Sequence, residues 1–171
     1  MSLKPCRECG REVSTEAVLC PQCGAPRPTN LAWKGTGIEW KSQARILGVP
    51  LIHVAFGRDQ YGKIRIAKGV IAVGQFAIGL ITVAQFGIGI LFGFGQFIFG
   101  LIALAQFAGA LFLGVGQIAT GVLAVGQFVA GWYGLCQVGW AKYLWSPAWV
   151  DAEALAMFST IKMRILDLLG L

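Results

Sequence analysis

Residues 69–141 read GVIAVGQFAIGLITVAQFGIGILFGFGQFIFGLIALAQFAGALFLGVGQIATGVLAVGQFVAGWYGLCQVGWA, a run without one Lys, Arg, Asp, Glu or His. Small residues recur in this run with a period of five. They are Gly74, Gly79, Ala84, Gly89, Gly95, Gly100, Ala105, Ala110, Gly116, Gly121, Gly126, Gly131 and Cys136. The step is six only where Phe94 and Val115 are inserted. The distance between these insertions predicts a repeat with four five-residue sides and a turn of about 20–21 residues.

A large apolar residue follows each small one by two positions. The large residues are Phe76, Ile81, Phe86, Leu91, Phe97, Ile102, Phe107, Phe112, Ile118, Leu123, Phe128, Tyr133 and Val138. Between small and large, every second unit carries glutamine: Gln75, Gln85, Gln96, Gln106, Gln117, Gln127 and Gln137. Alternate residues of an extended chain face the same way, so the small and large residues are predicted to point inward and glutamine outward.

Three transmembrane helices of ~20 residues would also suit the length of this run. Five residues make about 1.4 helical turns, so the small residues would scatter around such helices. Glycine recurs throughout the run, and each glycine costs roughly 0.5–1 kcal/mol in a helix interior relative to alanine. The period therefore favours a mainly β protein, a right-handed four-sided β-helix whose successive turns lie ~4.8 Å apart.

Units such as Gly74-Gln-Phe-Ala-Ile78 resemble the pentapeptide-repeat family, whose units read Ala, then Asp or Asn, then Leu or Phe, then two variable residues. The resemblance covers about residues 64–140 and implies a right-handed quadrilateral β-helix. This chain departs from that family where Gln or an aliphatic residue replaces Asp or Asn, and where the variable positions, polar in soluble members, are apolar. Predicted outward positions include Ala77, Thr82, Ile98 and Ala103. Soluble monomers do not expose so large an apolar surface, so the predicted surroundings are lipid.

Charged and aromatic residues flank the apolar run. Arg58, Asp59, Lys63, Arg65 and Lys68 precede it, and Trp140, Lys142, Tyr143, Trp145 and Trp149 follow it. The formal net charge of +6 comes entirely from residues 1–68. The positive-inside tendency then predicts a cytoplasmic N-terminal side at a membrane, which for a bacterial protein is the inner membrane. Residues 46–145 would stack about five four-sided turns, or ~24 Å at ~4.8 Å each, short of the ~30 Å hydrocarbon core.

Two CxxC motifs, Cys6-Arg-Glu-Cys9 and Cys20-Pro-Gln-Cys23, stand ten residues apart and are each followed by glycine. Four thiolates at this spacing suit one tetrahedral Zn²⁺ ion, and residues 4–26 resemble a zinc ribbon. A closed four-thiolate site has no open coordination position, so the expected zinc is structural. Gly10 and Gly24 are predicted to supply a positive φ. Two disulfides are the alternative, which a cytoplasmic location disfavours.

The remaining segments divide the chain as follows. Residues 1–27 form the zinc ribbon, residues 28–45 a linker and membrane-surface segment, and residues 46–145 the β-helix, of which 46–68 cap and 69–141 repeat. Residues 146–171 are predicted to form an amphipathic helix, with Ser146 as its cap and Pro147 in its first turn. Its apolar face carries Leu155, Phe158, Ile161, Ile165, Leu168 and Leu169.

These features indicate a non-enzymatic membrane scaffold whose zinc ribbon binds a protein partner. Arginine and glutamate balance in the ribbon, so a nucleic-acid partner is not expected. The combination of a zinc ribbon with an apolar five-residue repeat resembles uncharacterised bacterial proteins. This resemblance implies no activity. The alternative is an oligomeric pore or transport component, since a filled coil has no lumen of its own. The lone His53 is interpreted as a packed residue and Cys136 as a packed thiol.

With four sides per turn, the glutamines are predicted to form two opposite columns. Gln75, Gln96, Gln117 and Gln137 would stack on one face, and Gln85, Gln106 and Gln127 on the other. Amides at this spacing could bond within a column as a ladder. They could equally bond across an interface between copies of the chain in a homo-oligomer.

Overall fold

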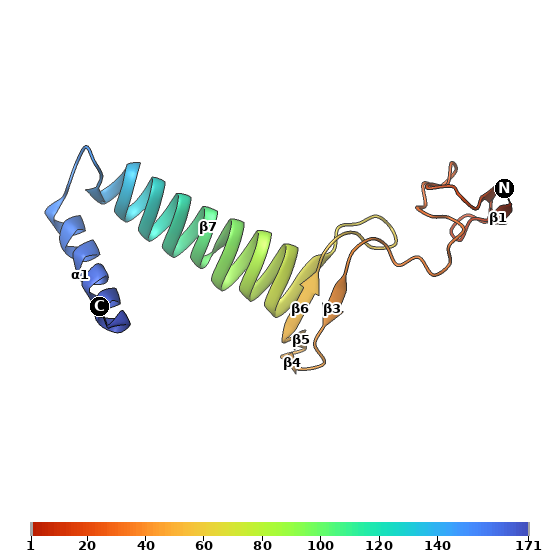
Figure 1. Cartoon of the computed structure of the whole chain (residues 1–171), viewed down its shortest axis with the longest axis horizontal. Coiled ribbons are helices and arrows are strands. Elements are labelled where there is room, and N and C mark those ends of the chain that lie inside the picture. The colour runs from red at the N-terminus through yellow and green to blue at the C-terminus, as the bar shows by residue number, and fades with distance from the viewer. Residues whose placement is uncertain (1, 171) are drawn as a thin grey trace.

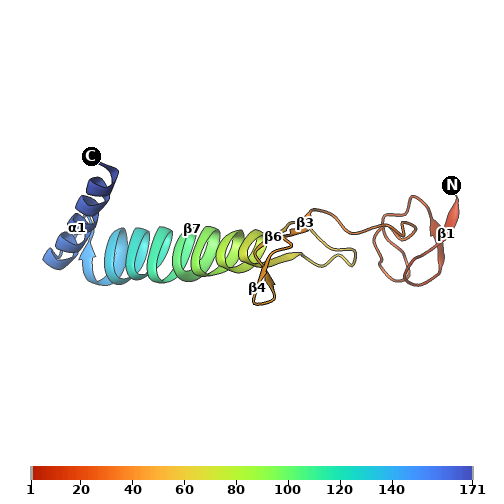
Figure 2. The same ribbon diagram turned by 90° about the horizontal axis from the view of Figure 1, so that it is seen from below.

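The computed structural model describes residues 2–170, which form a mainly β chain that ends in one helix. The elements are β1 (Leu3–Pro5), β2 (Glu12–Ser14), β3 (Glu39–Lys41), β4 (Arg45–Ile46), β5 (Val49–Pro50), β6 (Ile52–Ala55), β7 (Ile66–Trp145) and α1 (Ala152–Leu169). The small module that contains β1 and β2 lies at one end of an elongated molecule, and α1 lies at the other end (Figure 1). Between them, β7 winds around one axis in successive turns (Figures 1 and 2).

One turn of β7 contains ten or eleven residues. The rings of Phe76 and Phe86 stack with their centroids 5.4 Å apart, those of Phe86 and Phe97 at 5.0 Å, and those of Phe97 and Phe107 at 5.6 Å. At the start of the coil, β6 pairs in parallel with β7, placing Ala55 opposite Gly74. The predicted four-sided turn is therefore wrong, because two five-residue units, not four, complete each turn.

The small residues of the repeat allow neighbouring turns to approach closely. A Cβ atom on Gly79 would lie 2.6 Å from the carbonyl oxygen of Gly69, one turn earlier, and a Cβ on Gly139 would lie 2.5 Å from that of Val129. The nearest carbonyl to Gly116 is that of Ala105, eleven residues earlier, because Val115 is inserted between them. Glycine is thus favoured at these positions because a Cβ atom would collide with the backbone of the neighbouring turn. Packing in the interior of the coil is not the reason.

The interior of the coil is a narrow column of small side chains. Side chains that are 3% exposed or less recur along it at Ala67, Ala72, Ala77, Thr82, Ile98, Ala103, Ala108, Ala119, Ala124 and Val129. Ala77, Thr82, Ile98 and Ala103 were predicted to face outward, and that prediction is wrong. The large residues predicted to face inward lie outside instead, with Phe86 44% and Phe128 56% exposed. Five is an odd number, so side chains cannot alternate strictly between inside and outside from one unit to the next. The position of the bend in each unit therefore decides which residue points inward.

Larger interior side chains lie beside glycine. Ile98 adjoins Gly93, and a Cβ on Gly93 would overlap Ile98 Cγ2. A Cβ on Gly87 would lie 2.7 Å from Thr82 Cγ2, and one on Gly134 would lie 3.1 Å from Val129 Cγ1. The Thr82 hydroxyl donates a hydrogen bond to the Ile88 carbonyl (2.9 Å), which satisfies it inside the coil. Glycine therefore compensates for each larger neighbour and keeps the interior close-packed.

Short strands cover the N-terminal end of the coil. β3 pairs antiparallel with β6, with Glu39 opposite Ala55, so part of the predicted linker belongs to the sheet. β4 and β5 form a hairpin whose tip, Leu47, has a φ of 50° and is exposed. The capping role of residues 46–68 stays a prediction.

The helix α1 begins at Ala152, six residues after the predicted cap Ser146. Ser146 instead forms a turn with Trp149, while Asp151 accepts hydrogen bonds from the Leu144 amide (2.7 Å) and the Trp149 indole (3.1 Å). Phe158 is buried with its ring centroid 6.4 Å from that of Trp145, so the first half of α1 packs on the last turn. Among residues 2–170, no helix combines the length and the apolar character needed to cross a membrane.

Candidate metal centre

The four cysteines of the ribbon lie on two matching turns of the backbone. The Cys6 amide donates to the Arg11 carbonyl (2.8 Å) and the Gly10 amide to the Cys6 carbonyl (2.9 Å). The second turn repeats this pattern around Cys20, with the Gly24 amide donating at 2.9 Å. Gly10 and Gly24 both have a φ of 72°, and a Cβ on either would contact nothing within 4 Å. The predicted positive φ is confirmed, and it is the reason for glycine at both positions.

The four sulfur atoms converge on one point. All Sγ atoms lie within 4.8 Å of one another, with Cys6 and Cys23 at 3.7 Å and Cys9 and Cys20 at 3.7 Å. Four sulfurs placed ~2.3 Å from a central Zn²⁺ at tetrahedral corners would be ~3.8 Å apart. The sulfurs are too far apart for the predicted alternative of two disulfides, and all four cysteines are thiols. The donor set is closed, as a structural Zn²⁺ site requires.

Backbone amides prepare two of the sulfurs for a cation. Hydrogen bonds from the amides of Cys23 and Gln22 lower the pKa of Cys20 to about 6, and those of Cys9 and Glu8 lower the pKa of Cys6. The Ala25 amide also favours the Cys23 thiolate, but desolvation and the neighbouring thiols outweigh it and raise the Cys23 pKa to about 12. Four thiolates this close cannot coexist without a positive charge between them, and a divalent metal supplies it.

Residues 6–27 match the family model of a zinc-ribbon domain. The chain thus carries a zinc ribbon whose Cys6, Cys9, Cys20 and Cys23 are positioned to bind one metal ion, consistent with a structural Zn²⁺. Comparison with curated proteins gives no match for the chain, and comparison with solved structures gives none either. The match ends before the coil, so these comparisons do not support the resemblance of residues 64–140 to pentapeptide repeats.

Arg7, inside the first CxxC motif, ties the ribbon to the loop that precedes β7. Its guanidinium donates to the Gln60 carbonyl (2.8 Å) and the Trp33 carbonyl (3.3 Å), and its side chain is 8% exposed. The Arg27 guanidinium lies 5.5 Å from the Trp33 ring centroid. The sequence around Arg7 does not indicate this contact, because the acceptor Gln60 lies far along the chain.

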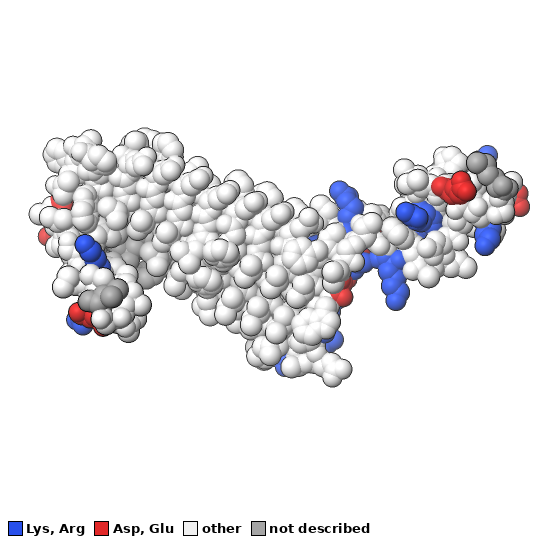
Figure 3. Space-filling view, in the orientation of Figure 1, with Lys and Arg blue, Asp and Glu red and all other residues white. Residues whose placement is uncertain are grey.

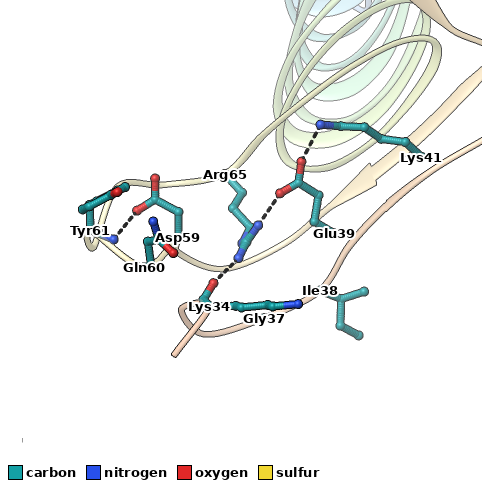
Figure 4. Close-up of a pocket in the computed structure, with 9 residues that line it drawn as sticks. All are labelled: Lys34, Gly37, Ile38, Glu39, Lys41, Asp59, Gln60, Tyr61 and Arg65. Atoms are coloured by element: carbon teal, nitrogen blue, oxygen red, sulfur yellow. Dashed lines mark hydrogen bonds and ion pairs between the residues drawn. The ribbon is translucent and has the colours of Figure 1, made fainter. Parts of the chain in front are cut away.

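A charged pocket of about 780 Å³ lies beside this contact, between β3 and the loop before β7 (Figure 4). Glu39 is one of its lining residues and accepts hydrogen bonds from Lys41 Nζ (2.8 Å) and from the Arg65 guanidinium. The hydrogen bond from Lys41 has the largest effect in lowering the pKa of the Glu39 carboxyl, and the charge of Arg65 lowers it further. The pocket brings together opposite charges that largely compensate each other, and its described lining residues include no nucleophile paired with a base.

His53 is buried behind Glu39. Its Nδ1 accepts a hydrogen bond from the Lys68 amide (2.8 Å), which leaves the ring proton on Nε2, 3.4 Å from a Glu39 oxygen. The ring therefore links β3, β6 and β7, in agreement with its interpretation as a packed residue. Cys136 is likewise a buried thiol in the coil.

The seven glutamines form one column, not two opposite columns. Successive members are ten or eleven residues apart, which is one turn of β7, so each lies above the previous one on the same side of the coil. Gln75 is half-buried and the other six are exposed. Between residues 69 and 143, the described side-chain hydrogen bonds come from Thr82 and Thr120, and none involves a glutamine. Within residues 2–170, the structure therefore gives these amides no partner.

Proposed function

We propose that this chain is a non-enzymatic scaffold that spans a membrane with β7 and presents its zinc ribbon to a protein in the cytoplasm. The outer surface of β7 supports this proposal. Its large side chains point outward, with Leu111 76% exposed near the middle of the coil. Charged residues lie on either side of the coil, in the part of the chain before β7 and in α1, and none appears over the middle of the coil in Figure 3. Such a surface suits lipid better than water.

The height of the coil is the observation that carries the proposal. At ten or eleven residues per turn, the charge-free run of residues 69–141 makes about seven turns, or ~33 Å at ~4.8 Å per turn. The hydrocarbon core of a bilayer is ~30 Å thick. With four-sided turns even the longer range of residues 46–145 was expected to reach only ~24 Å, and the two-sided turn removes that discrepancy. Lys68 and Lys142 mark the two ends of the run, and four aromatic residues cluster beside Lys142.

A two-sided coil would suit lipid, because hydrogen bonds from each turn to the turns above and below it would satisfy the backbone inside the membrane. The second candidate, a pore or transport component, gains less support. Ala103 and Ala124 fill the axis and are wholly buried, so the coil leaves no lumen. Conduction would require a ring of several chains.

The excess of Lys and Arg before β7 favours a cytoplasmic location for the ribbon. Three apolar side chains of the ribbon, Leu3, Val18 and Leu19, are exposed and suit a protein partner. Arginine and glutamate are equal in number over the ribbon sequence, which does not favour a basic groove for nucleic acid.

Two matched variants test membrane insertion. Leu111→Arg places a charge at mid-membrane depth, where it costs about 2–4 kcal/mol, and should reduce the fraction of protein retained in membranes after alkaline carbonate washing. Val18→Arg, at a side chain 71% exposed, should be retained like the wild type, which itself stays in the pellet. Release of the wild type by carbonate, or equal retention of both variants, would refute the proposal.

A further inference from the structure

A groove of about 530 Å³ runs along one side of β7, next to the glutamine column. Its floor is formed by Gly95, Ala105, Gly116 and Gly126, one small residue per turn, and Gln106 and Gln117 form one wall. Valine, leucine and phenylalanine side chains form the other wall. We call this surface the glutamine groove. It combines a floor that another chain can approach closely with a regular row of amides.

The opposite side of the coil has no corresponding polar row. Halfway around each turn from the glutamines stand Leu80, Ile90, Leu101, Leu111, Val122 and Trp132. Six of the seven glutamine side chains are exposed, and their amides have no partner within residues 2–170. A primary amide that faces hydrocarbon without a partner is costly. In the membrane-spanning arrangement proposed above, on which this inference rests, the glutamine side of β7 should therefore contact a polar partner and the opposite side should contact lipid.

The spacing of the amides favours a second copy of the same chain as that partner. The column presents one amide per turn, every ~4.8 Å, and another β7 coil offers amides at the same spacing over its full length. An α-helix repeats every ~5.4 Å. After four turns, a row of its side chains would therefore be displaced from the glutamines by about half of their spacing. Small residues at the interface let two backbones approach closely in a membrane, and interchain amide bonds add to that contact.

We propose that two copies of this chain associate side by side through the glutamine groove. Both copies insert with their ribbons on the same side, so the two-fold axis lies parallel to the coil axes. Each glutamine then faces its own counterpart at the same depth. Gln106 of one copy is closest to Gln106 of the other, and the small residues of the floor bring the backbones together.

Disulfide cross-linking in native membranes tests this arrangement. In a Cys136→Ala background with zinc-loaded ribbons, Gln106→Cys and Gln117→Cys should each yield a disulfide-linked dimer on mild oxidation. Leu101→Cys and Leu111→Cys, on the opposite side, are the matched controls and should remain monomeric. Equal cross-linking on both sides, no dimer at either glutamine position with a short bis-maleimide, or cross-linking to a different protein would overturn the proposal.

A second measurement distinguishes an interface from an internal ladder. Replacing Gln85, Gln96, Gln106 and Gln117 with leucine should halve the mass of the detergent-solubilised protein, measured by light scattering, with little loss of thermal stability. Unchanged mass with a lower unfolding temperature would contradict the dimer and favour bonding within the column. Carbonate washing of the same membranes separates the two proposals. Release of the protein defeats the membrane function, whereas retention without a dimer defeats only the interface.

Discussion

Replacing Gly93 with alanine should destabilise β7, because the added Cβ would overlap Cγ2 of Ile98. Ile98 is wholly buried, and its Cβ would lie only 3.6 Å from the new atom. Its β-branched side chain has few alternative rotamers, so it cannot swing away from the overlap. Overpacking of a rigid interior costs about 1–3 kcal/mol, and we expect Gly93→Ala to lie in the upper part of that range.

The second substitution, Ile98→Ala, makes the test specific. Alone it removes a buried side chain and should cost about 2–5 kcal/mol. Combined with Gly93→Ala it removes the overlap and leaves alanine at both sites, the arrangement already present one turn later at Ala103 and Ala108. The double variant should therefore lose about 1–3 kcal/mol less stability than the two single variants lose when their losses are added.

Denaturant unfolding of the detergent-solubilised protein, followed by the β-sheet circular dichroism signal, measures these differences. Gly87→Ala and Gly134→Ala provide a graded comparison, since their Cβ atoms would lie 2.7 Å from Thr82 Cγ2 and 3.1 Å from Val129 Cγ1. The loss of stability should decrease from Gly93 to Gly87 to Gly134. Strict additivity of the double variant, or a neutral Gly93→Ala, would contradict the close-packed interior.

Three further predictions concern the N-terminal half. Removing zinc with a chelator, or substituting Cys20→Ser, should unfold the ribbon and leave β7 intact, as zinc content and circular dichroism would report; loss of the β signal would contradict this. Arg7→Ala should keep the zinc but detach the ribbon, which limited proteolysis around Trp33 would detect as faster cleavage; an unchanged cleavage rate would mean that other contacts hold the ribbon. The pKa of Glu39 is lowered by Lys41 and Arg65, so its contribution to stability is complete above the ordinary value of 4.5 and is lost as the pH falls through the lower folded value. Glu39→Gln should flatten that acid dependence of the unfolding midpoint, and an unchanged profile would show that the ion pairs are not stabilising.

The metal centre could be predicted from the sequence because its determinants are local. Each CxxC motif forms its own turn, and Gly10 and Gly24 provide the conformation that the turn needs. The spacing of the cysteines therefore specified all four ligands. The contacts of Arg7 with Gln60 and of Glu39 with Arg65 could not be predicted, because each joins segments that are far apart in the sequence.

The fold of residues 69–141 could be predicted only in part. The five-residue period correctly excluded helices, because it reflects how a backbone turns. The number of units per turn was wrong because the distance between the insertions at Phe94 and Val115 was taken as one turn, whereas two turns separate them. The glutamines carried the better signal. They recur every ten or eleven residues, and this chemical period equals one turn of the coil.

The narrow interior also bears on the environment that the coil requires. A turn of ten or eleven residues has room on its axis for methyl groups, so alanine and glycine dominate there and the large side chains lie outside. Burying an alanine contributes far less than the roughly 1.5–3 kcal/mol of a large apolar side chain. In water such a coil would have little hydrophobic stabilisation and a large apolar surface. In lipid its stability would depend instead on backbone hydrogen bonds between turns, which a medium without water strongly favours. The composition of the interior is therefore a second reason, independent of the height of the coil, to propose that β7 lies in a membrane.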